Sequence, residues 1–270
     1  MKQQFIKTLR RLRLLPLAER VRLSLLIMQN YRSNRIFAKS ISGFSFPPYD
    51  VAYDAYGSID YETYYMNGRK AATFIYDILS EELPQKHIKI CEWGCGPGRI
   101  IRHLPSIDST KRLEVYGTDY NQKTIRWCKE NIKVGDIEFS PNKLAPPLPF
   151  KSNFLDCLYS VSVYTHLSEE MHFAWLQENL RVVRPGGLIL MTTHGDKSKN
   201  KLLHEEVDSY ETGKLVVRGD VVEGTRSYCA FHSPSFMRNT FLKGLEIVLH
   251  DSSPDPVIAG PQDVWVVRKT

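Results

Sequence analysis

Apolar residues of this chain fall into short runs separated by amphipathic stretches, beginning near residue 69. The runs have the length and composition of buried strands, and they lie at 87–92, 113–119, 136–139, 154–163 and 188–193. The stretches between them repeat their apolar positions every three or four residues, which is typical of helices. Strands that alternate with helices predict a parallel, doubly wound α/β sheet. Runs at 245–251 and 262–269 predict an additional antiparallel pair, for a mostly parallel sheet of seven strands.

The first 39 residues form a separate basic segment. They hold ten Lys and Arg residues against one acidic residue, a net charge of +9, whereas the whole chain carries +6 and the remainder therefore −3. Apolar stripes with helical spacing are interrupted by a proline, and they comprise Phe5, Leu9 and Leu12 before Pro16 and Leu17, Val21, Leu25 and Met28 after it. Such a helix could pack on the rest of the protein, lie on an anionic membrane or a partner, or bind nucleic acid.

Two segments outside the predicted sheet are expected to form a lid over the substrate. Residues 43–67 are rich in tyrosine and contain two prolines, which favours a packed loop with short helices over a flexible linker. Residues 196–232 are polar and include a predicted hairpin. The predicted organisation is therefore a basic helical extension and tyrosine-rich cap at 1–67, followed by the main domain at 68–270 with a lid insertion at about 196–232.

Composition restricts the class of protein. The chain has 42% hydrophobic and 24% charged residues, as ordinary globular proteins do. Its longest apolar run, at 23–28, is far shorter than the ~20 residues that a membrane-spanning helix needs, and no secretory signal is visible. Five cysteines, an odd number, do not form a disulfide framework. We expect a cytoplasmic protein, with the basic segment as a means of peripheral contact with the inner membrane surface.

The strongest chemical signal is a glycine-rich turn between the first predicted strand and the next helix. It reads Glu92-Trp-Gly-Cys-Gly-Pro-Gly-Arg99, and its glycines permit a tight turn and the close approach of a ligand. A phosphate-binding P-loop is excluded because no Lys-Ser/Thr pair follows, and the third glycine comes one residue too early for the dinucleotide fingerprint. Glu92 would repel a phosphate group but attract an ammonium group.

A second carboxylate completes the predicted ligand. Asp119 ends the second predicted strand 25 residues after Gly94, at the position from which a carboxylate binds ribose hydroxyls. Ligands of parallel sheets bind at the carboxyl ends of the strands, where both features lie. A ribose next to a cationic amino-acid end describes S-adenosylmethionine.

Four motifs in this order resemble the class I S-adenosylmethionine-dependent methyltransferases. They are EWGCGPGR at 92–99, GTDYN at 117–121, LPF at 148–150 leading to FLDCLYSVSVYTHL at 154–167, and RVVRPGGLIL at 181–190. The resemblance implies the Rossmann-like methyltransferase fold, S-adenosylmethionine as cofactor and S-adenosylhomocysteine as product. The segments FHSPSFMRNTF and QDVWVVRK resemble bacterial methyltransferases of unassigned substrate that are often found with glycan synthesis.

The resemblance also implies a set of cofactor-binding residues. The members are Arg69, Glu92, Gly94, Cys95, Gly96, Gly98, Asp119, Tyr120, Asn142 and Ser160. In this family the glycine turn lies beneath the methionine and ribose, the aspartate binds the ribose, and the following aromatic residue covers the adenine. Asn142 stands where many relatives carry an acidic residue beside the adenine amino group, Ser160 would face the methionine, and Arg69 could pair with its carboxylate.

Histidines after two strands are the candidates for a general base. His166 follows the fourth predicted strand and His194 the fifth, and a histidine pKa near neutrality suits proton transfer. Either residue could instead be structural. Cys91 and Cys95 have no partner pair in the sequence, so we expect no metal site.

The acceptor is predicted from charge and aromatic content. Tyrosines in the lid suit a sugar ring, and the acidic stretch at 204–211 does not suit a phosphate backbone. We therefore expect methylation of a hydroxyl on a small molecule or glycan, with a membrane-linked precursor as one option, and nucleic acid as a disfavoured partner. The alternatives are an RNA or protein methyltransferase that docks through the basic segment, or a cofactor-binding partner protein without catalysis.

Overall fold

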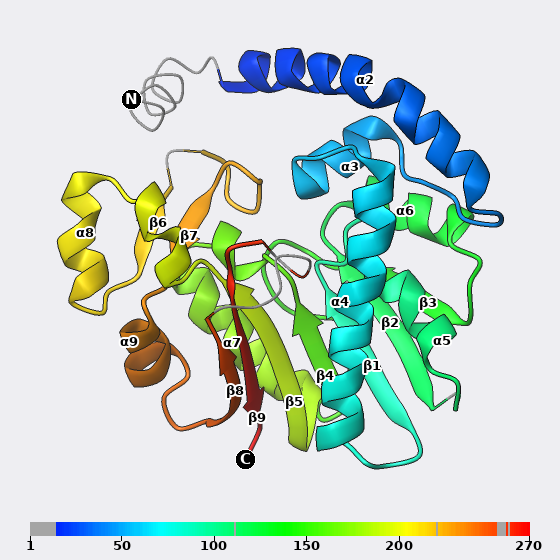
Figure 1. The fold of residues 1–270 in the computed structure, drawn as a ribbon. Coiled ribbons are helices and arrows are strands. Elements are labelled where there is room, and N and C mark those ends of the chain that lie inside the picture. The colour runs from blue at the N-terminus through cyan, green and yellow to red at the C-terminus, as the bar shows by residue number, and fades with distance from the viewer. Residues whose placement is uncertain (1–14, 111, 220, 253–257, 259) are drawn as a thin grey trace.

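The computed structural model describes residues 15–110, 112–219, 221–252, 258 and 260–270. The predicted stripe of Phe5, Leu9 and Leu12 lies outside these residues. A seven-stranded sheet forms the centre of the molecule, in the order β3-β2-β1-β4-β5-β9-β8 (Figure 1). Its strands are β1 (Ile88–Trp93), β2 (Leu113–Asp119), β3 (Ile137–Pro141), β4 (Leu155–Ser160), β5 (Val183–Thr193), β8 (Glu246–Asp251) and β9 (Asp263–Arg268).

The pairing within the sheet confirms the predicted doubly wound, mostly parallel fold. Strands β1 to β5 pair in parallel, whereas β9 runs antiparallel to both β5 and β8. The fifth strand begins five residues before the predicted 188–193, because residues 183–187 are part of β5, where the pairing with β4 shifts register between Leu155 and Cys157. The predicted hairpin is present as a separate two-stranded sheet of β6 (Val216–Arg218) and β7 (Cys229–Phe231).

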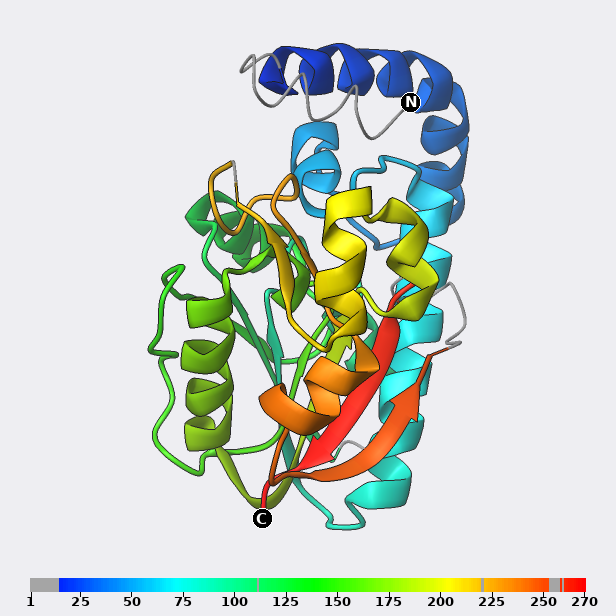
Figure 2. The same cartoon turned by 90° about the vertical axis from the view of Figure 1, so that its left-hand side faces the viewer.

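Helices cover both faces of the sheet (Figure 2). Alternate strand residues point to opposite faces, and the buried residues accordingly divide into two apolar clusters. One cluster lies under α4 (Tyr61–Glu82), α5 (Leu104–Ile107) and α6 (Gln122–Asn131), and the other under α7 (Glu169–Val182) and α9 (Pro234–Phe236). The remaining helices are α2 (Leu15–Ser40), α3 (Tyr49–Tyr56) and α8 (His204–Glu211), and short helical turns span 101–103, 164–166, 196–201 and 237–241.

Side-chain caps begin several helices where the sequence predicts them. Asn121 Oδ1 accepts hydrogen bonds from the backbone of Lys123 and Thr124, and Ser168 Oγ accepts one from Met171. One boundary differs, because α4 begins at Tyr61, eight residues before the expected start, with Asp60 as its cap. The helix therefore runs through residues 67 and 68, where the sequence places a domain boundary.

The helix α2 packs through a different face from the one predicted. Leu17, Val21, Leu25 and Met28 are between 54% and 79% exposed, so this stripe faces away from the core. Leu23, Leu26 and Ile27 pack instead against Ala52, Tyr53 and Ile59. Asn34 fixes the far end, since its Nδ2 donates to the carbonyl of Ile59 at 2.7 Å. Among the described residues, no helix is long and apolar enough to cross a membrane.

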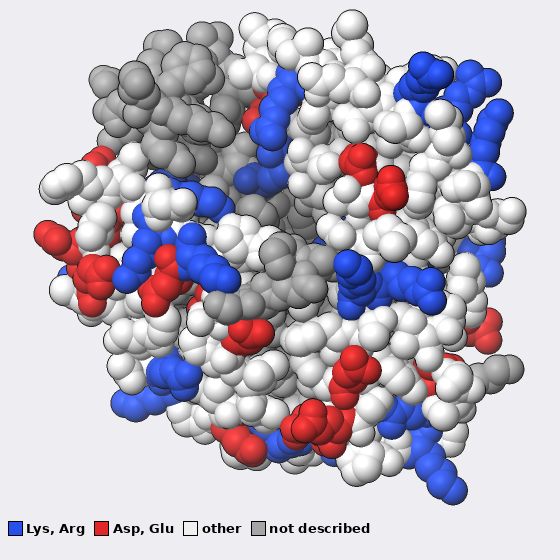
Figure 3. Space-filling model, viewed as in Figure 1, with Lys and Arg blue, Asp and Glu red and all other residues white. Residues whose placement is uncertain are grey.

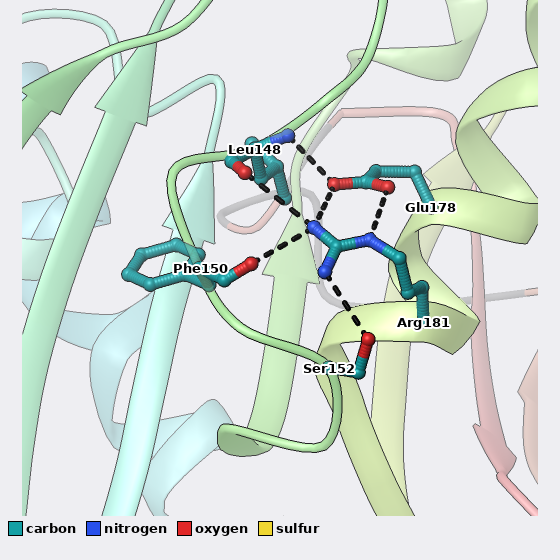
Figure 4. Close-up of polar contacts among 5 residues, drawn as sticks. All are labelled: Leu148, Phe150, Ser152, Glu178 and Arg181. Carbon is teal, nitrogen blue, oxygen red and sulfur yellow. Dashed lines mark hydrogen bonds and ion pairs between the residues drawn. The ribbon is translucent and has the colours of Figure 1, made fainter.

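An ion pair between the half-buried Arg181 and the buried Glu178 fastens the loop between β3 and β4 to α7 (Figure 4). Arg181 Nη2 lies 2.7 Å from Glu178 Oε1 and donates to the carbonyl of Phe150 at 2.9 Å. The same Glu178 oxygen accepts the backbone N–H of Leu148 at 2.6 Å. Farther along α7, Trp175 Nε1 donates to the carbonyl of Leu144 at 2.9 Å. The loop is thus held at both ends on the side chains of one helix.

We expect Arg181→Met to destabilise the protein. The substitution keeps the apolar stem but removes several charge-assisted hydrogen bonds and leaves the buried carboxylate of Glu178 without its cation. Urea unfolding should show a loss of about 1–3 kcal/mol in the free energy of unfolding. Arg126→Met on the exposed surface of α6 is the control, with an expected change within about 0.5 kcal/mol. Equal unfolding midpoints for the two variants would contradict this role of Arg181.

Candidate functional site

A cavity of about 570 Å³ opens at the carboxyl ends of β1, β2 and β4. Its size is that of a small-molecule site, and its position is where doubly wound sheets bind ligands. The lining combines the glycine turn, the ends of these strands, α3 and the first turns of α4, and the loop before β7. Predicted site residues among the lining are Glu92, Gly94, Cys95, Gly96, Asp119, Tyr120, Asn142, His166 and His194.

The glycine turn has a backbone that side chains would obstruct. Gly94 and Gly96 have φ values of 76° and 51°, in the left-handed region. A Cβ atom on Gly94 would lie 2.4 Å from Cγ2 of Val163, and one on Gly96 would lie 3.2 Å from the hydroxyl of Tyr56. The backbone N–H of Gly94 donates to the carbonyl of Thr118 at 2.8 Å, which ties the turn to β2. The glycines therefore keep this wall of the cavity close and free of side chains.

The carboxylate of Asp119 joins the glycine turn to the start of α6. Its Oδ2 accepts the N–H of Gly96 at 2.9 Å and its Oδ1 accepts the N–H of Asn121 at 2.8 Å. The residue is 8% exposed, and burial raises the pKa of the carboxyl. Each oxygen has two lone pairs, so both can accept a further hydrogen bond from a ligand.

Glu92 lies at the end of β1 in a fully enclosed position. Its Oε2 accepts the backbone N–H of Ile101 at 3.0 Å and the hydroxyl of Tyr159 at 2.9 Å. Burial raises the pKa of this carboxyl to about 8. The side chain therefore holds a proton over most of the neutral range and fixes the turn through neutral hydrogen bonds.

Asn142 presents a buried acceptor with no partner. Its backbone N–H donates to the carbonyl of Asp119 at 3.1 Å and its Nδ2 to the carbonyl of Lys143 at 2.6 Å, but its Oδ1 accepts no hydrogen bond. Beside it, the ring of Tyr120 is 41% exposed, and its hydroxyl donates to the carbonyl of Gly224 at 3.1 Å. An open acceptor, an aromatic face and a carboxylate with spare lone pairs fit an adenosine, whose amine and hydroxyls are donors.

Both candidate histidines line the cavity as neutral imidazoles. His166 Nδ1 lies 2.7 Å from the carbonyl oxygen of Tyr228, which can only accept, so this nitrogen carries the proton and Nε2 is an acceptor. Burial lowers the pKa of His166. Burial, with a contribution from Lys201, lowers the pKa of His194 to about 3, and its ring stacks on Phe231 with centroids 5.4 Å apart.

Three predicted residues do not line the cavity. Arg69 is exposed on α4, whereas Arg99, directly after the glycine turn, is in the lining with its guanidinium 5.2 Å from the ring centre of Tyr56. Gly98 lies behind the turn, where a Cβ atom would come within 2.5 Å of Ile132. Ser160 is buried and its Oγ has no hydrogen-bond partner.

Several lining residues are not among the predicted site residues. Arg99 and Ser162 lie within the quoted motifs, whereas Thr225, Arg226 and Gln262 come from segments that are distant in sequence. The two predicted lid segments do contribute to the lining, with Tyr56, Tyr61 and Tyr64 from 43–67 and Thr225 and Arg226 from 196–232. The loop before β7 is anchored by Arg226, which contacts the carboxylate of Glu19 on α2 and lies over the ring of Tyr53. The hydroxyl of Tyr53 also bonds to Glu19.

Residues 91–191 match the family model of a methyltransferase domain. The chain is 28% identical over 167 residues to a tRNA N(3)-methylcytidine methyltransferase of Schizosaccharomyces pombe, covering 57% of this chain and 50% of the relative. It is 30% identical over 144 residues to a tRNA (carboxymethyluridine(34)-5-O)-methyltransferase of Arabidopsis thaliana, covering 52% and 31%. The chain thus spans half or less of the length of these curated relatives.

A solved structure shows the same fold. It is an S-adenosylmethionine-dependent methyltransferase from Methanosarcina mazei, with a TM-score of 0.51 and 22% sequence identity. The superposition covers 72% of this chain and 97% of that structure.

The relatives correct the predicted acceptor and partner. They are named as tRNA methyltransferases, so the predicted small-molecule or glycan hydroxyl and the low weight given to nucleic acid are wrong, and the stated alternative of an RNA methyltransferase fits better. Neither the relatives nor the described helices support the expected membrane contact. Two acidic residues of the stretch at 204–211 are paired with basic residues of neighbouring elements, so the stretch repels phosphate less than its sequence suggests. Glu206 binds Arg218 at 2.5 Å and Glu211 binds Lys199 at 2.9 Å.

We expect Glu92 to make the stability of the protein fall with rising pH. Its pKa of about 8 in the folded chain exceeds the ordinary 4.5, so the folded state keeps a proton that the unfolded state releases between these values. Glu92→Gln cannot ionise, yet its carbonyl oxygen can accept the same two hydrogen bonds. Between pH 5.5 and 8.5, the wild type should lose on the order of 1–3 kcal/mol more unfolding free energy than this variant.

Denaturant unfolding at pH 5.5 and pH 8.5 measures this difference in unfolding free energy. The buried histidines contribute equally to the wild type and to Glu92→Gln, so their titration cancels in the comparison. Glu138→Gln, at an exposed position of β3, is the control and should keep the pH profile of the wild type. Parallel profiles for wild type and Glu92→Gln would show that Glu92 is ionised throughout.

Fold, motif order and site chemistry agree on one family. The seven-stranded sheet has a single strand, β9, that runs antiparallel to both of its neighbours, and the matched domain begins within β1 and ends within β5. The cavity offers an open acceptor at Asn142 and a buried carboxylate at Asp119. Its cofactor is S-adenosylmethionine, and S-adenosylhomocysteine is the product that remains after transfer. Residues 91–191 are a methyltransferase domain, and the chain has the fold of the class I S-adenosylmethionine-dependent methyltransferases.

Proposed function

We propose that this enzyme transfers a methyl group to a pyrimidine nucleoside of tRNA. The observation that carries the proposal is that curated relatives matching half of the chain are named as tRNA methyltransferases. Their names differ in the methylated position, N3 of cytidine in one and 5-O of carboxymethyluridine(34) in another, but both nucleosides are pyrimidines. The proposal therefore names the class of nucleoside and leaves the methylated atom to experiment.

The surface of α2 supports an RNA partner. Arg20, Arg22, Arg32, Arg35 and Lys39 are exposed, and none of them forms an ion pair with another described residue of the chain. Figure 3 shows Lys and Arg side chains gathered over the C-terminal half of this helix. Cations without protein counter-ions are available for phosphate groups, whose neutralisation dominates the binding of nucleic acids.

The cavity also suits a base that leaves its stack. Enzymes that modify a base take it out of the helix into a pocket and hold it against aromatic side chains. Tyr56, Tyr61 and Trp175 line the cavity beside the polar groups of the glycine turn. Stacking on such faces is worth ~1–3 kcal/mol for each base.

The residues of the cavity divide between cofactor and acceptor in this proposal. Asp119 accepts the ribose hydroxyls, the ring of Tyr120 covers the adenine, and Asn142 accepts its amino group. Arg99 is better placed than the exposed Arg69 for the methionine carboxylate. Bound S-adenosylmethionine supplies a methyl group on a sulfonium, which is a good leaving group. The chain then has to align the acceptor with that methyl and exclude water.

His166 and His194 are proposed to face the acceptor. The unprotonated Nε2 of His166 can accept a hydrogen bond from the acceptor or take up its proton. His194, with its pKa lowered to about 3, stays neutral and provides an uncharged wall. We also infer a cytoplasmic setting, because all five cysteines are free and four of them are buried.

Asp119→Ala should weaken binding of S-adenosylhomocysteine. The substitution removes the acceptor for two hydroxyls and also frees the N–H of Gly96, so we expect a loss of about 1–3 kcal/mol, or roughly 5- to 150-fold in Kd. Isothermal titration calorimetry measures the change. Arg69→Gln is the control outside the lining and should bind within about twofold of the wild type. Unchanged affinity for Asp119→Ala would place the ribose elsewhere, and a loss for Arg69→Gln would assign the carboxylate to Arg69.

Reversing charges on α2 should weaken the use of tRNA. With total tRNA lacking endogenous modification as substrate, we expect the wild type to transfer labelled methyl groups, with a KM that rises steeply with salt. The variant Arg32→Glu/Arg35→Glu/Lys39→Glu should raise the KM at least about tenfold and flatten the salt dependence. Its affinity for S-adenosylhomocysteine should stay unchanged, because α2 lies outside the cofactor end of the cavity.

The matched control is Lys86→Glu/Lys133→Glu/Lys151→Glu. These three exposed lysines precede β1, β3 and β4 and therefore lie at the opposite end of the sheet. This triple variant should keep a KM within about twofold of the wild type. No transfer by the wild type to any tRNA would refute the proposed substrate, and equal KM values for the two triple variants would refute the role of α2.

A further inference from the structure

Ser162 has a backbone conformation that is costly for its residue type. It lies two residues after β4, lines the cavity and has a φ of 63°, in the left-handed region. A residue with a Cβ atom adopts this conformation only at an energetic cost, and it persists only where the surroundings hold it. Such strain next to a ligand cavity is a reason to ask which interactions maintain it.

A closed ring of hydrogen bonds holds Ser162. Its backbone N–H donates to Thr192 Oγ1 at 2.8 Å, and the Thr192 hydroxyl donates to Gln262 Oε1 at 2.7 Å. Gln262 Nε2 closes the ring by donating to Ser162 Oγ at 2.7 Å. The three residues come from the end of β4, the end of β5 and the position before β9, so the ring ties three neighbouring strands together.

The ring has a single direction, which determines what the serine hydroxyl can do. Thr192 Oγ1 accepts the backbone N–H of Ser162, and its hydroxyl donates to Gln262 because the amide oxygen of Gln262 faces it. This orients the amide of Gln262 with its nitrogen toward Ser162. The Ser162 oxygen is thus engaged as an acceptor, while its proton takes no part in the ring. With Thr192 fully buried and Gln262 6% exposed, the arrangement is shielded from competing water.

The cavity therefore combines a donor and an acceptor four residues apart. Ser162 offers its hydroxyl proton, and His166 offers the lone pair of Nε2, because Nδ1 donates to Tyr228. Thr165 Oγ1 donates to the carbonyl of Ser162 at 2.6 Å, which fixes the turn between them. The Watson–Crick edge of either pyrimidine carries both acceptors and a donor. In uracil these are O2, O4 and N3–H, and in cytosine they are O2, N3 and the 4-amino group, so a site with one donor and one acceptor can bind either base.

We propose that Ser162 is a specificity-determining residue that donates its hydroxyl proton to a carbonyl oxygen or ring nitrogen of the acceptor pyrimidine. Gln262 and Thr192 are positioning residues that hold the serine in its strained conformation and direct its proton into the cavity. This inference rests on the proposed tRNA acceptor and adds the group that recognises the base. A ring that merely anchored the loop would matter for stability and cofactor affinity instead.

The test measures tRNA methylation by the full chain with Ser162→Ala, which removes the donor. We expect KM for tRNA to rise about 5- to 100-fold while kcat, the melting temperature and the affinity for S-adenosylhomocysteine stay near wild type. Ser162→Gly should raise the KM similarly while relieving the backbone strain, and it covers the case in which the alanine variant folds poorly. Thr192→Ser keeps the ring hydroxyl and is the control, with the KM of the wild type.

A double-mutant cycle tests the ring itself. Gln262→Met keeps the size of the side chain but removes the donor to Ser162. As a single substitution it should therefore raise the KM for tRNA. Added to Ser162→Ala, it should raise the KM no further, because it acts through the serine. Additive effects would overturn the positioning role of Gln262.

The outcomes separate the inference from the proposed function. If the wild type methylates no tRNA, the proposed function is refuted and the inference falls with it. If the wild type is active and both Ser162 variants keep its KM, the inference alone is refuted. Loss of cofactor affinity or of thermal stability in both variants, with no selective rise in KM, would show that the ring is only an anchor.

Discussion

The site depends on one carboxylate that holds two backbone N–H groups. Asp119 accepts from Gly96 in the glycine turn and from Asn121 at the start of α6, so one side chain fixes the ends of β1 and β2 relative to each other. Its own carbonyl accepts the N–H of Asn142, which places the loop after β3 against the same cavity. The loops that follow β1, β2 and β3 are thus all hydrogen-bonded to Asp119. The buried charge is sustained by these donors, and its spare lone pairs are what a ribose requires.

The opposite side of the cavity is assembled in another way, by contacts between segments that are distant in sequence. The loop before β7 reaches His166 through the N–H of Gly224 and the carbonyl of Tyr228. Arg226 joins the same loop to Glu19 on α2, and Tyr53 on α3 contacts both the carboxylate and the guanidinium. This side of the cavity is therefore made of elements that the central sheet does not position by itself. This explains how one methyltransferase fold can serve different acceptors while its cofactor side stays the same.

Local physics made the sheet and the cofactor half of the cavity predictable from sequence. Strand β2 lies where the apolar run places it, and Asn121 caps α6 because a short polar side chain before a helix has few alternatives. The position of Asp119 follows from its place at a strand end. Gln262 and Arg226 carried no such signal, since their roles depend on which distant segments meet. The face of α2 was also mistaken, because Leu17 and Leu25 share the apolar character of Leu23 and periodicity cannot tell which stripe finds a partner.

The acceptor was mistaken for a related reason, because counting charges along a sequence ignores their pairing. The acidic residues of α8 suggested a surface that repels phosphate, yet Glu206 and Glu211 are bound to Arg218 and Lys199 within the same part of the chain. On α2 the opposite holds, since Arg32, Arg35 and Lys39 are exposed and form no ion pair with any other described residue. A phosphate backbone responds to the charge that remains after such pairing. By that measure the surface of α2 attracts a polyanion, although the chain beyond residue 39 is acidic in sum.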